Sequence, residues 1–208
     1  MKDLAVEFRQ KYAIAGIFLF VFVMVFLVFK AYGTINAREW SILIWVILLF
    51  TGLNAIIKSF MQESSGTYLY YYTLIEPIEL LVSKIIYNFV LLTLLFLFII
   101  GLMFVFVGFP VKDLSLFSIA SLGGILGISA IFTFVSIISA TDKGSGTMMS
   151  ILALPLILPI FLLLLKTTTV SARLISDTSV YDDVMLIYGL DSMLIGLMIF
   201  LFPNLWRS

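Results

Sequence analysis

The sequence predicts an all-α polytopic membrane protein with six transmembrane helices. Its 208 residues are 62% hydrophobic and only 12% charged, and the mean hydropathy of +1.21 lies far above that of soluble domains. Residues 17–29 are apolar without a break, whereas β-barrel strands alternate polar and apolar residues over about 10 positions. Helices are therefore the expected spanning structure, because a helix satisfies its own backbone hydrogen bonds inside the bilayer.

The first expected element is an amphipathic helix over residues 2–12 that lies along the membrane interface. Its apolar side consists of Leu4, Ala5, Phe8 and Tyr12. Its polar side consists of Asp3, Glu7, Gln10 and Lys11. The acidic residues in this leader, and an apolar run that no small-residue cleavage motif follows, favour an uncleaved anchor over a signal peptide.

Six apolar stretches follow, and each is expected to form one transmembrane helix of a single domain covering residues 1–208. The spans lie at about 13–29, 41–57, 85–109, 116–140, 147–166 and 184–203. Most of them have a length that crosses a bilayer, which takes about 20 residues. Because the number of spans is even, both termini are expected on the same side of the membrane.

Lysine and arginine residues predict the orientation of these spans. With the N-terminus inside, the inner side holds Lys2, Arg9, Lys11, Lys58, Lys84, Lys143 and Arg207. The outer side then holds Lys30, Arg38, Lys112, Lys166 and Arg173. The three positive charges before the first span favour this choice, since early positive charges usually dominate. Both termini and residues 58–84 are therefore expected in the cytoplasm.

Residues 58–84, between the second and third spans, are too long and too polar for a simple turn. Glu76, Pro77 and Glu79 are typical of a helix start, because proline fits the first turn and carboxylates favour the positive end of the helix dipole. A helix from Pro77 is expected to run straight into the third span. Ahead of it, residues 63–67 favour a turn or cap.

A tyrosine cluster lies in the same segment and consists of Tyr68, Tyr70, Tyr71 and Tyr72. Tyrosines and a helix could fill a groove on a cytoplasmic partner, which makes the segment a docking surface. Alternatively, the segment is an interfacial helix whose tyrosines lie among the headgroups. The length of the segment favours docking.

The fifth span carries Pro155 and Pro159, each of which removes a backbone donor and bends the helix. We expect either a gate along a transport pathway or a kink that only gives the helix its shape. The fourth span carries small residues that let helices approach closely, which predicts a packing face. These residues are Ala120, Gly123, Gly124 and Gly127.

Asp191 is the one clear acid inside an expected span, and a carboxylate at this depth is a candidate for function. A hydroxyl, a water or a neighbouring subunit would also satisfy it. Asn54, near the inner end of the second span, is expected to hold helices together. Trp40 and Trp206 lie at predicted span ends, where tryptophan favours the headgroup layer.

The residue types offer little catalytic chemistry. The sequence contains no cysteine and no histidine, which removes thiol nucleophiles, imidazole bases and the commonest transition-metal ligands. Residues 142–147 resemble a phosphate-binding loop only superficially, because they lack the Walker pattern and join two spans. The acids Asp177, Asp182 and Asp183 favour a solvated surface over a catalytic cluster. A membrane enzyme or an autonomous channel is therefore the weakest hypothesis, and we predict no metal site.

A set of residues in and after the 58–84 segment resembles the pattern of ABC-2-type export permeases, and above all of the CcmB family. In chain order this set consists of Glu63, Gly66, Thr67, Pro77, Lys84 and Asn88. Three further stretches agree with that family and extend the likeness over most of the chain. They are the leader up to Tyr12, the proline-rich residues 154–159 and a last span that contains Asp191.

This resemblance implies a noncatalytic permease subunit in the bacterial cytoplasmic (inner) membrane. It implies an ATPase partner, CcmA, and the haem-handling partners CcmC, CcmD and the haem chaperone CcmE. The segment between the second and third spans of such permeases rests on the ATPase, which implies a coupling role for matching residues here. These residues are Glu63, Gly66, Thr67, Pro77, Glu79 and Lys84.

The leading hypothesis is the transmembrane subunit of an ABC complex for cytochrome c maturation. It would support haem export or delivery, or the ATP-driven release of the haem-loaded chaperone. The alternative is an ABC-2 permease that exports a lipid, a polysaccharide or a drug. Protein ligands of haem iron are normally His, Cys, Met or Tyr, and this chain offers only the last two. We therefore expect no firmly bound cofactor in this chain. Haem is expected to be the cargo, with the ligands of its iron in partner chains, and ATP is expected to bind to the partner ATPase.

Overall fold

The computed structural model describes residues 11–33, 35–62, 77–139, 145–173 and 179–207. These residues form six α-helices and no strand. The helices are α2 (Lys11–Tyr32), α3 (Ala37–Gln62), α5 (Pro77–Phe106), α6 (Leu114–Ser139), α7 (Ser145–Arg173) and α8 (Ser179–Arg207). Each contains a stretch that is long and apolar enough to cross a membrane, so the predicted all-α six-span architecture is confirmed. The expected interfacial helix 2–12 lies almost wholly outside the described residues.

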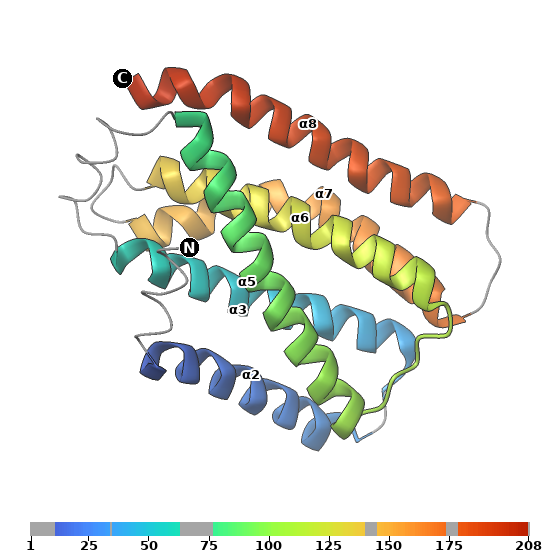
Figure 1. Ribbon diagram of the computed structural model, residues 1–208. Helices are drawn as coiled ribbons and strands as arrows, with labels where there is room; N and C mark the ends of the chain where they lie inside the picture. Colours follow the sequence, from blue (N-terminus) through green and yellow to red (C-terminus); the bar gives the residue numbers. More distant parts are fainter. Residues whose placement is uncertain (1–10, 34, 63–76, 140–144, 174–178, 208) are drawn as a thin grey trace.

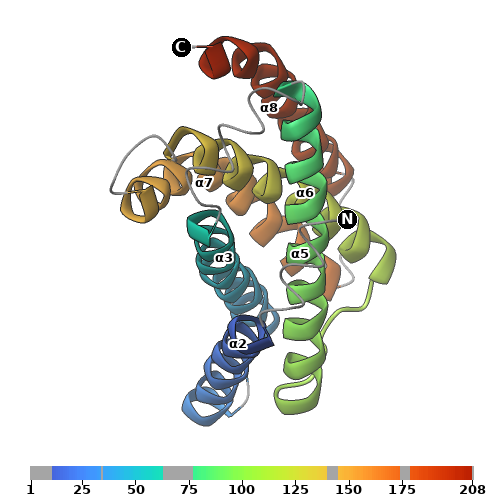
Figure 2. The ribbon, with the colours of Figure 1, turned by 60° about the vertical axis from the view of Figure 1, so that its left-hand side comes forward.

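Successive helices run in opposite directions, as Figure 1 shows. The start of α2, the start of α5 and the end of α8 consequently lie at one end of the bundle, which we call the inner end because it is the predicted cytoplasmic end. α6 is central and packs against α3, α5, α7 and α8, whereas α2 is peripheral and contacts α3 and α5 (Figure 2).

Local backbone and capping interactions explain where α2 ends and α3 begins. Asn36 caps α3, since its side-chain oxygen accepts hydrogen bonds from the backbone N–H groups of Arg38 and Glu39, both at 3.0 Å. Glu39 returns a bond to the Asn36 N–H, also at 3.0 Å, which completes a capping box. Gly33 ends α2 with a positive φ of 63°, a conformation that glycine adopts without steric cost.

Residues 167–183, the polar stretch between the expected fifth and sixth spans, are helical at both ends. α7 continues to Arg173 and α8 begins at Ser179. The hydroxyls of Thr167, Thr168 and Thr169 donate to carbonyl oxygens one turn earlier in α7, so these polar side chains are satisfied by the helix itself. For this reason α7 continues through these polar residues.

Trp40 is part of the core, so the prediction that its ring lies in the headgroup layer is wrong. Its exposed fraction is 1%, and its indole N–H donates to the carbonyl of Gly108 at 3.1 Å. The rings of Phe109 and Phe117 lie 5.6 and 5.9 Å from it, centre to centre. The connection between α5 and α6 thus covers this tryptophan. The side chain of Trp206 lies outside the described part.

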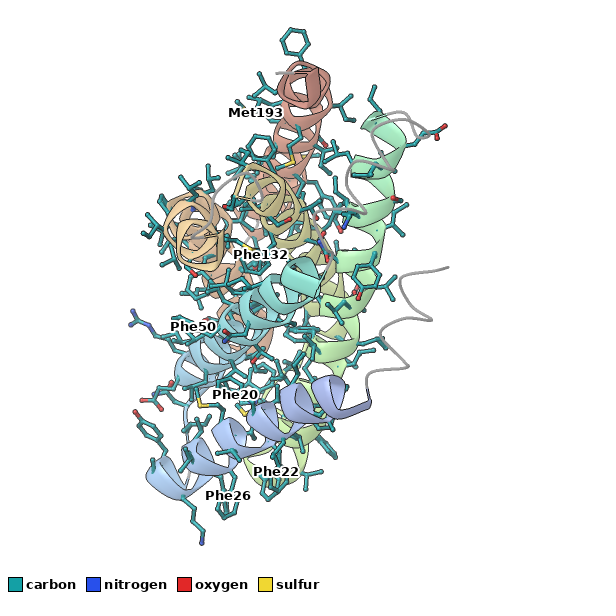
Figure 3. The ribbon with its side chains drawn as sticks, turned by 90° about the vertical axis from the view of Figure 1, so that its left-hand side faces the viewer. Phe20, Phe22, Phe26, Phe50, Phe132 and Met193 are labelled. Carbon is teal, nitrogen blue, oxygen red and sulfur yellow. The ribbon has the colours of Figure 1, made fainter. Side chains whose placement is uncertain are left out.

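The glycines of α6 form the predicted packing face. A Cβ on Gly123 would lie 3.1 Å from side-chain atoms of α8, and a Cβ on Gly124 would overlap Leu164 of α7. α6 can therefore approach both helices closely only because these positions lack side chains. Large apolar side chains such as Phe22 and Phe26 project from the outside of the bundle, whereas Phe132 is fully buried (Figure 3).

Candidate functional site

The first two turns of α5 have one exposed side and one buried side at the inner end of the bundle. Ile78 and Glu79 are exposed, and Glu79 belongs to the first turn. On the other side of the same turns, buried apolar residues contact α6 and α8. This inner cluster consists of Leu80, Leu81 and Ile85 of α5, Ala130 of α6 and Met198 of α8. The start of α5 is consequently accessible from outside and also packed onto two other helices.

The structure describes only part of the expected coupling residues. Glu63, Gly66 and Thr67 lie outside the described residues, between α3 and α5. Pro77 begins α5, which confirms the predicted helix start and its continuation into the third span. At about 100° of helix rotation per residue, Lys84 lies on the same helix face as Pro77, and Glu79 lies on nearly the opposite face. Glu79 and the half-buried Lys84 therefore do not form one cluster.

Asp191 lies in α8, inside the apolar stretch Val180–Leu201. Its exposed fraction is 1%, and neither carboxyl oxygen has a hydrogen-bond partner among the described residues. A Cβ on Gly127 would overlap Oδ1 of this carboxyl and would lie 2.7 Å from Ile160 Cδ1. The carboxyl therefore occupies space that exists only because residue 127 of α6 is glycine. The sequence marked both residues but could not show that they meet.

A buried hydroxyl of α6 forms a hydrogen bond with α5. The side-chain amide of Asn88 in α5 donates to Thr133 Oγ1 at 2.8 Å, and Thr133 Oγ1 donates to the carbonyl of Ser129 at 2.7 Å. Ser136 Oγ donates in turn to the carbonyl of Thr133. This contact between α5 and α6 was not predicted, although Asn88 stood out from the sequence.

Asn54 does not bind a neighbouring helix of this chain, so the predicted role in holding helices together is wrong for the chain by itself. Its side chain is exposed, and its amide donates to the carbonyl of Phe50 in the same helix at 2.9 Å. Asn54 lies on the outer side of α3, because the buried residues of this helix lie on its other sides.

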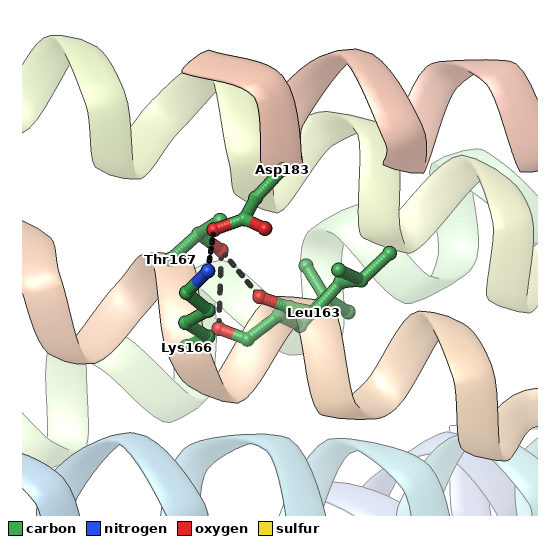
Figure 4. A network of polar contacts seen from close by, with 5 residues as sticks. Leu163, Lys166, Thr167 and Asp183 are labelled. Atoms are coloured by element: carbon green, nitrogen blue, oxygen red, sulfur yellow. Dashed lines mark hydrogen bonds and ion pairs between the residues drawn. The ribbon is translucent and has the colours of Figure 1, made fainter. Parts of the chain in front are cut away.

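Asp183 joins α8 to α7 at the outer end. Its carboxylate lies 2.7 Å from the ammonium of Lys166 and has an exposed fraction of 7%, so the expected solvated role is wrong for this acid (Figure 4). Lys166 lies inside α7 and Asp183 lies near the start of α8, and the packing of these two helices brings the charges together. Thr167, next to Lys166, instead donates to the carbonyl of Leu163 (Figure 4). Asp182 is exposed, and Asp177 lies outside the described residues.

Pro155 and Pro159 both lie inside α7. Their side chains are exposed on the surface of the bundle, next to the exposed residues Leu154 and Leu158. Within this chain they therefore line no interior pathway. The role of the two prolines, as a gate or as a kink that only shapes the helix, stays a prediction.

Taken together, the fold and the inner end of α5 define the class as a multi-pass α-helical membrane protein. Comparison with family models gives a match to the family described as CcmB protein over residues 1–207. The chain belongs to this family. It is thus the membrane subunit of an ABC transporter of cytochrome c maturation, whose ATPase partner is CcmA. Comparisons with curated proteins and with solved structures gave no match.

Proposed function

We propose that this chain works at the haem-handling step of cytochrome c maturation. ATP hydrolysis in CcmA would drive haem export or delivery, or release of the haem-loaded chaperone, through this subunit. The proposed further partners are CcmC, CcmD and the chaperone CcmE, and the proposed location is the bacterial cytoplasmic (inner) membrane. Both termini would lie in the cytoplasm. Family membership over nearly the whole chain supports each of these assignments.

The observation that carries the mechanism is the continuity of α5. One helix of 30 residues, about 45 Å long, begins at the exposed inner end and continues across the bundle. Because Leu81 and Ile85 are buried against α6 and α8, a displacement of the first turn would move those helices as well. α5 also contacts α2 and α3, so it connects the ATPase side to most of the bundle.

The amino-acid composition of this chain supports the proposal that the ligands of the haem iron belong to other chains. The sequence has no histidine and no cysteine, and its methionines and tyrosines are the only residues of the usual haem-ligand types. We therefore assign to this chain the transmission of movement, and to its partners the bonds to iron.

Charge reversal at the exposed start of α5 tests the coupling role. Glu79→Arg should leave the complex assembled and its ATPase active, while mature c-type cytochromes are lost. Asp182→Arg, an exposed acid at the opposite end of the bundle, is the matched control and should retain normal cytochromes. Normal cytochrome c assembly in Glu79→Arg would contradict the coupling role. If deletion of the chain left c-type cytochromes intact while another exported compound accumulated, the cargo assignment would be wrong.

A further inference from the structure

Asp191 is a buried carboxyl that has no role in the proposed coupling mechanism. Neither of its oxygens has a hydrogen-bond partner among the described residues, and its exposed fraction is 1%. An ionised carboxylate in such surroundings is strongly unfavourable unless a cation or several donors face it. The site therefore requires a proton, a cation or a donor that the described residues do not supply.

The packing of α6 and α7 around Asp191 also leaves a space that its carboxyl fills. Gly127 of α6 leaves room that a Cβ would fill, and Ile160 of α7 closes that space from another side. Ile187, one turn before Asp191 in α8, is fully buried. The carboxyl thus fits between three helices in an apolar environment, where a neutral acid is far better tolerated than its anion.

The titratable side chains that the structure describes on the surrounding helices form no hydrogen bond with Asp191. α6 carries no ionisable side chain between Leu114 and Ser139. Lys166 of α7 pairs with Asp183, and the Tyr188 hydroxyl donates to the carbonyl of Ile119 at 2.9 Å. The remaining titratable side chains that the structure describes on α5, α7 and α8 are Glu79, Lys84, Tyr87, Tyr181 and Asp182; those of Arg173 and Arg207 lie outside the described part. None of these groups, in the part of the chain that the structure describes, forms a hydrogen bond with Asp191.

We propose that Asp191 is a proton-binding site of this subunit: the carboxyl holds a proton while α8 packs against α6 at Gly127, and releases it when the two helices separate. In the packed arrangement the neutral carboxylic acid fills the space at Gly127. Separation admits water, the O–H bond breaks, and the proton passes to water while the electron pair stays on the carboxylate. Renewed packing of α8 on α6 requires that a proton be taken up again.

The inner cluster connects this site to the start of α5. Met198 belongs to the same buried cluster as Leu81 of α5 and lies seven residues, or about 10 Å, further along α8 than Asp191. A displacement of α5 would therefore also displace α8 at a point about two turns from the Asp191 carboxyl. This link to ATP hydrolysis rests on the proposed function, whereas the proton site itself does not.

Infrared spectroscopy of the intact complex in lipid at neutral pH tests the proton directly. The spectrum of the unaltered complex should contain the carbonyl band of a protonated carboxyl, and Asp191→Asn should remove it. Asp182→Asn, at an exposed acid of the same helix, is the matched control and should leave the band in place. If Asp191→Asn removes a carboxylate band instead, the residue is charged and faces a cation or a basic side chain of a partner, which overturns the proposal.

A second measurement avoids any dependence on the folding of a variant. Aspartate with a heavy carbon in its side-chain carboxyl, incorporated into the unaltered complex, should shift the protonated-carboxyl band. The absence of a shift overturns the proposal. Neither infrared result depends on the cargo, so an error in the haem assignment would leave both unchanged.

Maturation in the Asp191→Asn complex tests the release step. The amide has the shape of the neutral acid but cannot ionise, so the complex should assemble with its ATPase while mature c-type cytochromes are lost. Normal cytochrome levels in that complex would overturn release of the proton during the cycle.

Discussion

At the scale of single residues, two glycines set distances that larger residues would prevent. Gly127 leaves space for Asp191, and a Cβ on Gly52 of α3 would overlap Leu92 of α5. In a bilayer, helices associate through close packing and not through removal of apolar surface from water, so such positions contribute directly to stability. Asp191 depends on this packing, since the alternative to its buried position is exposure to lipid.

Gly127→Ala should destabilise the protein by about 1–3 kcal/mol, because the added methyl group overlaps the Asp191 carboxyl and crowds Ile160. Thermal or denaturant unfolding in detergent measures the effect. Gly101→Ala is the matched control: a Cβ there meets nothing within 4 Å, and alanine favours the helix by roughly 0.5 kcal/mol. Equal effects of the two substitutions would refute the close contact at Gly127.

At the scale of helices, α5 is fixed at its inner end by apolar contacts and α7 is fixed to α8 at the outer end by an ion pair. Leu81 is fully buried in the inner cluster. Lys166 and Asp183 lie at the opposite end, and the lysine side chain is 51% exposed. The two contacts therefore differ in chemistry and in expected strength.

Leu81→Ala should loosen α5 from α8 and cost roughly 2 kcal/mol, because the truncated side chain leaves a cavity in the inner cluster. We expect the complex to assemble while cytochrome c maturation falls and ATP hydrolysis persists. Leu97→Ala, on the same helix but 59% exposed, should change neither property. The paired comparison of ATPase activity with cytochrome content is the measurement, and equal maturation in both variants would count against transmission through Leu81.

A double-mutant cycle with Lys166→Met and Asp183→Asn should give a coupling energy of about 1 kcal/mol or less. The exposure of Lys166 allows water and salt to screen the pair, although Asp183 is buried. Unfolding free energies of the four proteins supply the measurement. A coupling of several kcal/mol would show that the pair is more thoroughly desolvated than this geometry implies.

At the scale of the whole molecule, composition and apolar run length were sufficient to predict six helices and their order. Pro77 also marked the start of α5 correctly. The sequence did not reveal contacts between residues that are far apart in the chain. Asp183 was expected to be solvated because its partner Lys166 is 17 positions away. Trp40 was expected at the interface because no neighbouring residue indicated that residues 108–117 cover it. Asp191 was noticed through its charge, but its contact with Gly127 depends on tertiary packing.

The predicted orientation can be tested on the whole chain because the sequence contains no cysteine. A single cysteine at Lys112→Cys should react with a membrane-impermeant maleimide in intact cells. A single cysteine at Glu79→Cys should react only after the membrane is opened, since the inner end is expected in the cytoplasm. The reverse pattern would place the start of α5 on the wrong side for an ATPase contact.

The central claim is that the exposed start of α5 is where CcmA acts on this subunit, and site-specific photocrosslinking tests it most directly. A photoreactive residue at position 79 in the intact complex should form a crosslink to CcmA. The same residue at position 105, which is exposed at the other end of the helix, should form none. Absence of the crosslink at position 79, in a complex that contains CcmA, would contradict the claim.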